Sequence, residues 1–353
     1  MGSPYGIADS SKWLVRYVHP STRRRAPVQA LPRAWHAEEH DPSEAATVVF
    51  LGDLMASARE GPVDVSPSLR HRIAAADLVV LNCESLVGER PFIGLLVFIM
   101  SQAYLERVLE ALSIDPANAV ASVANNHIQD RAASGCDELA GRLDGLGFTL
   151  IGLRGAEGNP IVTVERRGLR LGFAAWTEWM NRDRNPVGCA VWRPESIDQA
   201  ILPSRSSAEH DAVIGCVHWD YEFCHFPTAA TVGRAHMLLD RSFSLLVGHH
   251  PHVLQPIEGR GNGFCQYSLG NLTPMPARVI HWATAVGGLL EVQFATQGPE
   301  RGRITAYELT PFFQWRKGKQ LTLRDVSDLP KPLRRRVSAR VNLLFPPEAS
   351  GRA

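Results

Sequence analysis

Five short apolar runs recur along the chain, and each is followed at once by polar residues with metal-binding atoms. The first run, residues 45–51, is rich in β-branched and aromatic residues and stops at Gly52-Asp53. The other four cover 77–81, 119–123, 212–217 and 244–247, and polar groups follow them at 82–84, 125–127, 218 and 248–252. Short continuous apolar runs of this kind are typical of buried strands. We therefore predict five buried strands that deliver polar side chains at their ends.

Helical spacing of apolar residues occurs between these runs and predicts helices over 104–112, 136–146 and 231–242. Alternating strands and helices favour an α/β domain. Residues 160–177 differ, because two β-rich runs flank Arg166-Arg167-Gly168, which is the pattern of a hairpin. The sheet structure is therefore expected to be mixed rather than purely parallel.

The ends of the chain lack this alternation. Residues 1–45 show no periodicity and are assigned to an N-terminal extension. Further strands, expected over 264–268, 287–294 and 304–309, extend the domain to about residue 325. Residues 326–353 are expected to form a C-terminal tail with a peripheral helix and a loose end. The sequence thus predicts one domain over 46–325.

Charge excludes some partners. With 37 Lys and Arg against 36 Asp and Glu, the 353-residue chain has a formal net charge of +1, which gives no general attraction for nucleic acid or acidic membranes. The longest apolar stretch, residues 92–100, is far shorter than the roughly 20 residues that span a bilayer. We expect no nucleic-acid partner and no stable membrane insertion.

The N-terminus and the cysteines bear on the compartment. The first 25 residues have charges and prolines where a signal peptide needs an apolar core. No CxxC pair occurs among the six cysteines, so we interpret them as buried free thiols of a reducing compartment: Cys83, Cys136, Cys189, Cys216, Cys224 and Cys265. A cytoplasmic location is expected.

Histidines are concentrated in one part of the chain. Six of the 13 lie between positions 218 and 252, and the unit His250-Pro251-His252 holds two imidazoles around a proline that restricts the backbone. Two others of the six, His225 and His236, are interpreted as structural. Together with the carboxylates of Asp53 and Glu84 and the amide of Asn126, these imidazoles make a mixed nitrogen and oxygen donor set. Such a set suits Mn, Fe, Zn or Co better than a thiolate zinc site, and it can hold one or two divalent ions.

The order of these polar motifs is itself distinctive. They are Gly52-Asp53, Asn82-Cys83-Glu84, ANNH at 124–127, His218-Trp219, GHHPH at 248–252 and YSLGN at 267–271. In this order the chain resembles the CapA family of poly-γ-glutamate capsule synthesis proteins, within the calcineurin-like metallophosphoesterase superfamily, over about residues 46–275. The resemblance implies an α/β sandwich of two mixed β-sheets flanked by helices.

The resemblance also implies roles for individual residues. Asp53 and His252 would bind the first ion, and Glu84 would bridge both ions. The second ion would be held by Asn126, His218 and His250. His127 would protonate the leaving group, and Asp130, three residues further on, is placed to orient an imidazole. Asn125 and Asn126 could each cap the following helix, and only the resemblance selects Asn126 as the ligand.

Some positions depart from the superfamily pattern. Met55 stands where the first motif has a histidine, so the first ion loses a donor and the number of ions stays open. Asp220 replaces a glycine, and it could bind metal, orient His218 or repel an anionic substrate. His249 also replaces a glycine and is expected to contact substrate, and Asn271 is a further candidate polar contact.

These observations favour a metal-dependent hydrolase in which a metal-activated water attacks a phosphoester, or an amide or ester of a glutamate-like or biosynthetic substrate. The substrate would be a small molecule or a short polymer. The alternative is a metal-binding accessory protein of poly-γ-glutamate or related polymer synthesis without turnover of its own. The oligomeric state cannot be derived from the sequence.

Overall fold

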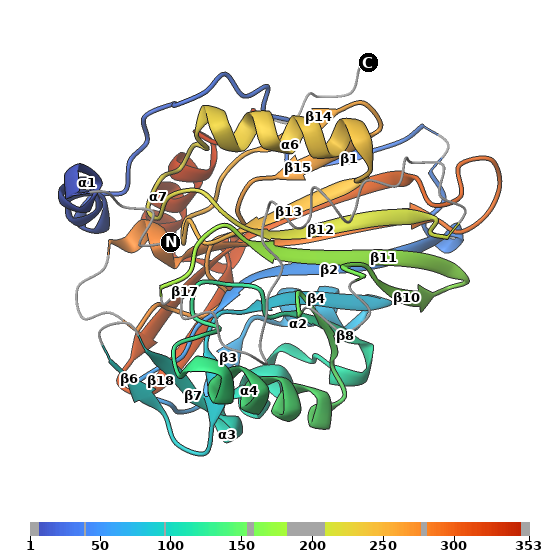
Figure 1. The fold of residues 1–353 in the computed structure, drawn as a ribbon. Coiled ribbons are helices and arrows are strands. Elements are labelled where there is room, and N and C mark those ends of the chain that lie inside the picture. Colours follow the sequence, from blue (N-terminus) through green and yellow to red (C-terminus); the bar gives the residue numbers. More distant parts are fainter. Residues whose placement is uncertain are drawn as a thin grey trace.

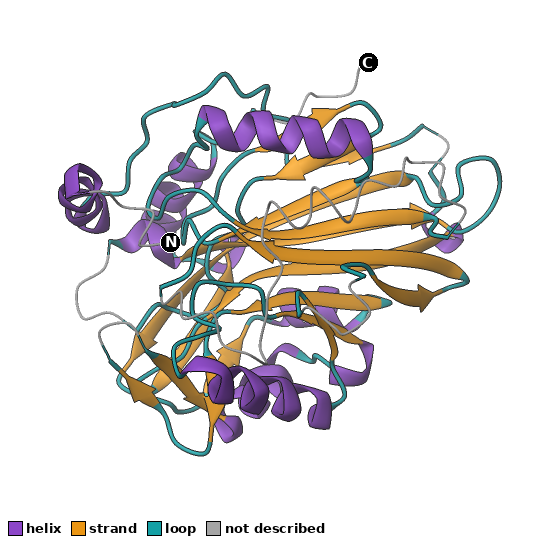
Figure 2. Cartoon of the chain, in the orientation of Figure 1, coloured by secondary structure: helices purple, strands orange, loops and turns teal. Residues whose placement is uncertain are grey.

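Two β-sheets pack face to face and carry helices on their outer sides in the computed structural model (Figures 1 and 2). The structure describes residues 7–38, 40–94, 97–153, 159–181, 209–276 and 281–346. The larger sheet has the strand order β3-β18-β17-β16-β2-β4-β8-β9, with β1 paired to β17. Its strands are β1 (Ala34–His36), β2 (Ala45–Leu54), β3 (Val63–Val65), β4 (Leu78–Cys83), β8 (Ala119–Ser122), β9 (Thr149–Ile151), β16 (Val286–Ala295), β17 (Ile304–Lys317) and β18 (Gln320–Asp325).

The smaller sheet has the order β10-β11-β12-β13-β15-β14, and a small third sheet has the order β5-β7-β6. The strands of these two sheets are β10 (Val162–Arg166), β11 (Leu169–Thr177), β12 (Ala212–His218), β13 (Leu245–His249), β14 (Ile257–Arg260), β15 (Gly263–Gln266), β5 (Leu86–Gly88), β6 (Phe92–Ile93) and β7 (Phe98–Ser101). Both large sheets are mixed: β2, β4 and β8 are parallel and β16 is antiparallel to β2, while β11, β12 and β13 are parallel and β10 is antiparallel to β11. The predicted α/β sandwich and the predicted hairpin are confirmed.

The helices lie outside the two sheets. They are α1 (Ile7–Val18), α2 (Pro67–Ala74), α3 (Gln102–Leu112), α4 (Ala132–Leu146), α6 (Ala229–Arg241) and α7 (Lys331–Val341). Figure 1 shows α6 along the smaller sheet, where it contacts β13, β14 and β15, and α2, α3 and α4 on the side of the larger sheet. The central strands are covered on both faces, which is why β2 and β4 read as continuous apolar runs in the sequence.

The carboxyl ends of β2 and β13 are both held against the segment that connects β15 to β16. Asp53 N donates a hydrogen bond of 2.9 Å to Gly270 O, and Leu269 N donates one of 3.2 Å to Gly248 O. A Cβ atom on Gly52 would lie 2.0 Å from Gly270 O, and one on Gly248 would lie 1.9 Å from Tyr267 O. Only glycine allows this approach. The polar residues that end strands of both sheets therefore face one another.

The N-terminal extension is more structured than the sequence indicates. It contains α1, and β1 pairs antiparallel with β17 of the larger sheet. At the other end, α7 buries Val337 and Val341 and so fits the expected peripheral helix. Among the described residues, no helix is long and apolar enough to cross a bilayer.

One cysteine departs from the prediction. Cys83, Cys216, Cys224 and Cys265 are buried free thiols as expected. Cys136, however, is disulfide-bonded, and the prediction is wrong for it, because the absence of a CxxC pair does not exclude a pairing between distant positions. Cys189 lies outside the described residues. Cysteine usage therefore no longer supports a reducing compartment, and the cytoplasmic location stays a prediction.

Candidate metal centre

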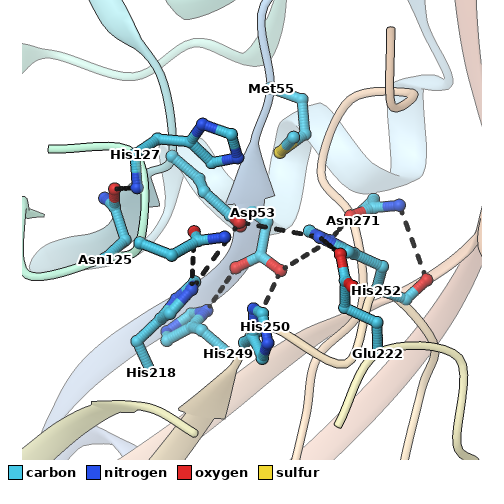
Figure 3. A network of polar contacts seen from close by, with 12 residues as sticks. Asp53, Met55, Asn125, His127, His218, Glu222, His249, His250, His252 and Asn271 are labelled. Carbon is cyan, nitrogen blue, oxygen red and sulfur yellow. Dashed lines mark hydrogen bonds and ion pairs between the residues drawn. The ribbon is translucent and has the colours of Figure 1, made fainter. Parts of the chain in front are cut away.

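Asp53, near the end of β2, lies at the centre of a buried polar network (Figure 3). Its Oδ1 accepts hydrogen bonds from Asn82 Nδ2 at 2.8 Å and from His249 Nδ1 at 2.9 Å, and its Oδ2 lies 3.4 Å from His252 Nδ1. Burial alone would raise the pKa of this carboxyl, but the hydrogen bonds from His249 and His252 outweigh burial and hold the pKa well below its ordinary value. Asp53 is thus a buried anion near the carboxyl ends of β2 and β13, which belong to different sheets.

Two groups of donor atoms can each hold a metal ion, and they share Glu84. One group is Asp53, Glu84 and His252, and the other is Glu84, His218 and His250; within each group the donor atoms lie within 4.8 Å of one another and all are buried. Asn126 joins the second group, with its Oδ1 3.0 Å from His218 Nε2. The structure therefore brings together all six residues predicted as ligands, in the two groups that the sequence analysis assigned.

Several of these donors lack the partners that burial demands. Within the described part of the chain, both carboxylate oxygens of Glu84 and both ring nitrogens of His250 are buried without a hydrogen-bond partner. Burial raises the pKa of Glu84 well above its ordinary value, with the charge of Asp53 adding to the effect, and burial lowers the pKa of His250 to about 4. Buried polar atoms are costly when unpaired. A divalent cation would supply the missing partner, and the nitrogen and oxygen donors suit Mn, Fe, Zn or Co.

The backbone of the His-Pro-His unit is held in an unusual conformation. His250 and His252 have φ angles of 92° and 53°, a region that costs residues other than glycine about 1–3 kcal/mol each. The carbonyl of Pro251 between them accepts a 2.8 Å hydrogen bond from Phe223 N. His252 Nδ1 donates to Asn271 Oδ1 at 2.9 Å, which leaves Nε2 3.6 Å from Glu84 Oε1. The loop is therefore fixed so that a defined nitrogen faces the bridging carboxylate.

The choice between the two adjacent asparagines follows from their contacts. Asn125 Oδ1 accepts a hydrogen bond from His127 N at 3.1 Å, and its Nδ2 donates to Cys83 O at 2.8 Å. The side chain of Asn125 thus stabilises the loop itself, whereas that of Asn126 reaches His218. Neither caps the next helix, since α4 begins after Arg131.

His127 lies beside the donor groups, and contacts with Asp130 and Phe98 orient its ring. Its Nδ1 is hydrogen-bonded to Asp130 Oδ2 at 2.8 Å, and its ring stacks on Phe98 with the ring centroids 4.3 Å apart. Asp130 Oδ2 also accepts Phe98 N at 2.8 Å, so one carboxylate positions both rings. Nε2 is then the ring nitrogen that can exchange a proton with a reacting group.

The three residues predicted to contact substrate are buried and have partners inside the protein. His249 donates to Asp53, and Asn271 accepts from His252, so each holds a predicted ligand. Asp220 Oδ2 accepts a 3.0 Å hydrogen bond from Thr228 N just before α6, and burial raises the pKa of Asp220 to about 6. Contact with substrate stays a prediction for all three.

Sequence reasoning missed three side chains of this network. Asn181 Oδ1 accepts a hydrogen bond from Asn126 Nδ2 at 3.3 Å, and Asn181 Nδ2 lies 3.3 Å from His127 Nδ1. Asn82 Nδ2 lies 2.8 Å from Asp53 Oδ1 and 3.4 Å from His218 Nδ1, and so joins the two donor groups. Glu222 Oε1 lies 3.7 Å from His252 Nε2. A signal for Glu222 was present, because it is a carboxylate four residues after His218, in the loop that follows a predicted strand.

Comparison with known proteins identifies the family. Residues 47–274 match the model of the family described as Bacterial capsule synthesis protein PGA_cap, which is more than half of the chain. The chain belongs to this family. The predicted CapA-type membership is thus confirmed, and the PGA_cap region contains both donor groups.

Curated relatives resemble part of the chain. The Capsule biosynthesis protein CapA of Bacillus anthracis is 30% identical over 162 residues, which cover 43% of this chain and 39% of that protein. The PGA biosynthesis protein CapA of Bacillus subtilis (strain 168) is 31% identical over 166 residues, which cover 43% of this chain and 41% of that protein. The chain therefore matches less than half the length of these two PGA_cap relatives.

Solved structures with a related arrangement of strands and helices are more distant. A hypothetical protein from Thermus thermophilus has a TM-score of 0.46 and 19% identity, covering 76% of this chain and 99% of that chain. A novel phosphatase from Mycoplasma pneumoniae has a TM-score of 0.47 and 12% identity, covering 76% of this chain and 94% of that chain.

Proposed function

We propose that this PGA_cap protein is a metal-dependent hydrolase. The observation that carries the proposal is the pair of buried donor groups that share Glu84, whose carboxylate oxygens have no hydrogen-bond partner among the described residues. Such an arrangement is costly as a purely structural device, because a buried carboxylate without partners destabilises the folded chain. It is understandable as a site built to receive cations.

One divalent ion would be held by Asp53 and His252. The other would be held by Asn126, His218 and His250, and Glu84 would contribute to both sites. Divalent ions bound in this way lower the pKa of water and stabilise the negative charge that develops on the group being cleaved. His249 and Asn271 keep Asp53 and His252 in place through hydrogen bonds of 2.9 Å each. Ligands oriented by such contacts bind metal more tightly.

His127 would transfer the proton that hydrolysis requires at the leaving group. Asp130 fixes the Nδ1 side of the ring, so that Nε2 is the atom from which a proton passes to the departing oxygen or nitrogen. Phe98 stacks on the ring and limits its rotation. In this proposal, His127 transfers the proton and Asp130 orients the imidazole ring.

The substrate we propose is a small molecule or a short polymer with a phosphoester bond, or with an amide or ester bond to a glutamate-like unit. The names of the two Bacillus relatives, which refer to capsule and PGA biosynthesis, support the glutamate-like class. We propose that nucleic acid is not the substrate, since the net charge of the chain is only +1.

The test is a substrate screen with matched variants. Wild-type protein loaded with Mn²⁺ is assayed with p-nitrophenyl phosphate, bis-p-nitrophenyl phosphate, γ-glutamyl-p-nitroanilide and poly-γ-glutamate, beside His250→Ala and His127→Ala. Hydrolysis that is lost in both variants, while circular dichroism shows that they are folded, supports the proposal. Activity equal to wild type in both variants overturns it.

A second candidate function is supported by Met55. Its side chain is buried beside Asp53, where it offers only a thioether, a poor donor for the harder divalent ions (Figure 3). A metal-binding accessory protein of polymer synthesis could tolerate such a site without turnover. Saturable binding of poly-γ-glutamate with no hydrolysis of any substrate in the screen would favour this second function.

A further inference from the structure

Glu222 lies in a loop whose backbone is fixed against the metal centre. The loop follows β12, and Asp220 and Phe223 on either side of Glu222 have φ angles of 64° and 59°. Trp219 N donates to His249 O at 3.2 Å, and Phe223 N donates to Pro251 O at 2.8 Å. The loop is thus attached on both sides of Glu222 to the segment that carries the histidine donors.

The side chain of Glu222 points at one of those donors. Glu222 Oε1 lies 3.7 Å from His252 Nε2, the same nitrogen that lies 3.6 Å from Glu84 Oε1. The other ring nitrogen, Nδ1, is already hydrogen-bonded to Asn271. Two carboxylates therefore converge on the free nitrogen of one imidazole, and Figure 3 shows Glu222 beside His252 on the side of the network away from His218.

The N-terminal helix holds Glu222 in this position. Trp13 of α1 donates a hydrogen bond from its indole nitrogen to Glu222 Oε2, the oxygen that does not face His252. The rings of Trp13 and Tyr17 pack on Phe223, with centroid distances of 5.9 and 5.5 Å. Ser21 N donates to Phe223 O at 2.7 Å, which attaches the chain after α1 to the same loop. These contacts leave Oε1 directed toward the site.

The number of donors in the first group is smaller than a metal ion needs, and Glu222 could supply a further one. The first group offers three donors, Asp53, Glu84 and His252, while tetrahedral or octahedral ions need four or six. Met55, two residues after Asp53 in the chain, offers only sulfur. The second group has a fourth donor in Asn126, and the carboxylate of Glu222, 3.7 Å from His252 Nε2, is an oxygen donor beside the first group.

We propose that Glu222 is an additional carboxylate donor to the ion held by Asp53 and His252, and that Trp13 is the positioning residue that aims it. The inference rests on the proposed metal-binding function. It assigns the N-terminal helix a part in the metal site, and it implies that the first ion is lost first when this helix is displaced.

The test measures Mn²⁺ binding to the full chain, stripped with a chelator and titrated with Mn²⁺ while free Mn²⁺ is followed by electron paramagnetic resonance. We expect two equivalents for wild type, and for Glu222→Gln an affinity weakened roughly 10–100-fold for one equivalent only. Glu110→Gln, on the exposed side of α3, is the matched control and should bind as wild type does. If Glu222→Gln binds both equivalents like wild type, this inference is wrong while the proposed function stands. If wild type binds no Mn²⁺, both fail.

Two further variants separate a donor from a merely structural residue. Met55→His places a nitrogen donor beside Asp53, so it should restore the lost equivalent in a Met55→His, Glu222→Gln double variant. Trp13→Phe keeps the ring packing but cannot donate to Glu222; it should weaken the same equivalent, and it should have no further effect when combined with Glu222→Gln. If the losses of Mn²⁺ affinity in Trp13→Phe and Glu222→Gln add in the double variant, the proposed role of Trp13 is wrong. If Met55→His does not restore Mn²⁺ binding in Glu222→Gln, the proposed role of Glu222 is wrong.

Discussion

His252 and Asn271 are joined by a 2.9 Å hydrogen bond between Nδ1 and Oδ1 that determines which imidazole nitrogen faces Glu84. Asn271 is itself fixed, because its side-chain Nδ2 donates to Thr284 O at 3.2 Å and its main-chain carbonyl accepts a 2.9 Å hydrogen bond from Gln314 Nε2. Its amide cannot easily turn to present nitrogen instead of oxygen. Asn271 therefore sets the form of His252 that is competent to bind metal.

Replacing Asn271 with alanine should reduce metal affinity by roughly 10–100-fold, because His252 loses the acceptor that orients it. The measurement is competition for Zn²⁺ against a chromophoric chelator. Asn118→Ala, an exposed asparagine whose Nδ2 donates to Asp115, serves as the control. Equal affinities for Asn271→Ala and wild type would show that other contacts suffice to orient His252.

His127→Ala should lower kcat by about 10²–10⁴-fold on any substrate found, since the proton donor is removed. The number of metal equivalents should not change, because His127 belongs to neither donor group. Asp130→Asn should give a smaller loss, as the ring remains but its orientation weakens. Steady-state kinetics with parallel metal analysis tests both, and a loss of metal in His127→Ala would contradict the assigned role.

A pH-dependent contribution to stability should arise from His225. This fully buried ring lies 3.1 Å from Leu254 O and 2.7 Å from Arg340, and burial, followed by the charge of Arg340, lowers its pKa from 6.5 to about 3. Between pH 6.5 and 3 the unfolded chain binds a proton that the folded chain does not, so stability is complete above this window and falls as the pH drops through it.

The corresponding experiment compares wild type with His225→Gln in urea unfolding at pH 7.5 and pH 5.0. Wild type should lose about 2 kcal/mol more than the variant over this change, at about 1.4 kcal/mol per pH unit below the unfolded pKa. The absolute stability of the variant does not matter for this comparison. Parallel losses in the two proteins would mean that His225 does not resist protonation in the folded chain.

Gly248→Ala should be strongly destabilising, because its Cβ would lie 1.9 Å from Tyr267 O in backbone that cannot move aside. We expect a loss of about 1–3 kcal/mol or more in the free energy of unfolding. Gly141→Ala in α4 is the control: its Cβ would meet nothing within 4 Å, so the change should stabilise by about 0.5–1 kcal/mol. Urea titrations of both variants decide the matter.

The positions of most candidate donors could be predicted because they follow runs whose apolar pattern is unambiguous, whereas the choice of Asn126 and the role of each donor came from the family resemblance. Asp53 and His218 end strands that are buried on both faces, and such strands are readable without knowledge of their neighbours. The hydrogen-bond partners of these residues were harder to predict from the sequence. That Asn271 would meet His252 depends on how the loop after β15 lies against the His-Pro-His unit, and no local pattern encodes this contact.

The N-terminal helix escaped prediction for a related reason. Its apolar residues do recur at helical spacing, but Leu14, Val15 and Val18 are 60%, 64% and 45% exposed, so the pattern does not mark a face buried against a sheet. Its attachment comes instead from Trp13 and Tyr17, which pack on one loop of the smaller sheet. A contact between a helix and a loop about 200 residues further along the chain leaves no local pattern in the sequence.

The donors that meet at Glu84 come from both sheets and from opposite halves of the chain. A cation bound among them would link the two layers of the sandwich. It would bind the folded chain but not the unfolded one. At a free ion concentration 100 times the Kd, this linkage contributes about 2.7 kcal/mol per ion to the free energy of unfolding. The thermal stability of the protein would then depend on the concentration of free metal ion around it. At low ion concentration, a larger fraction of the chains would be unfolded.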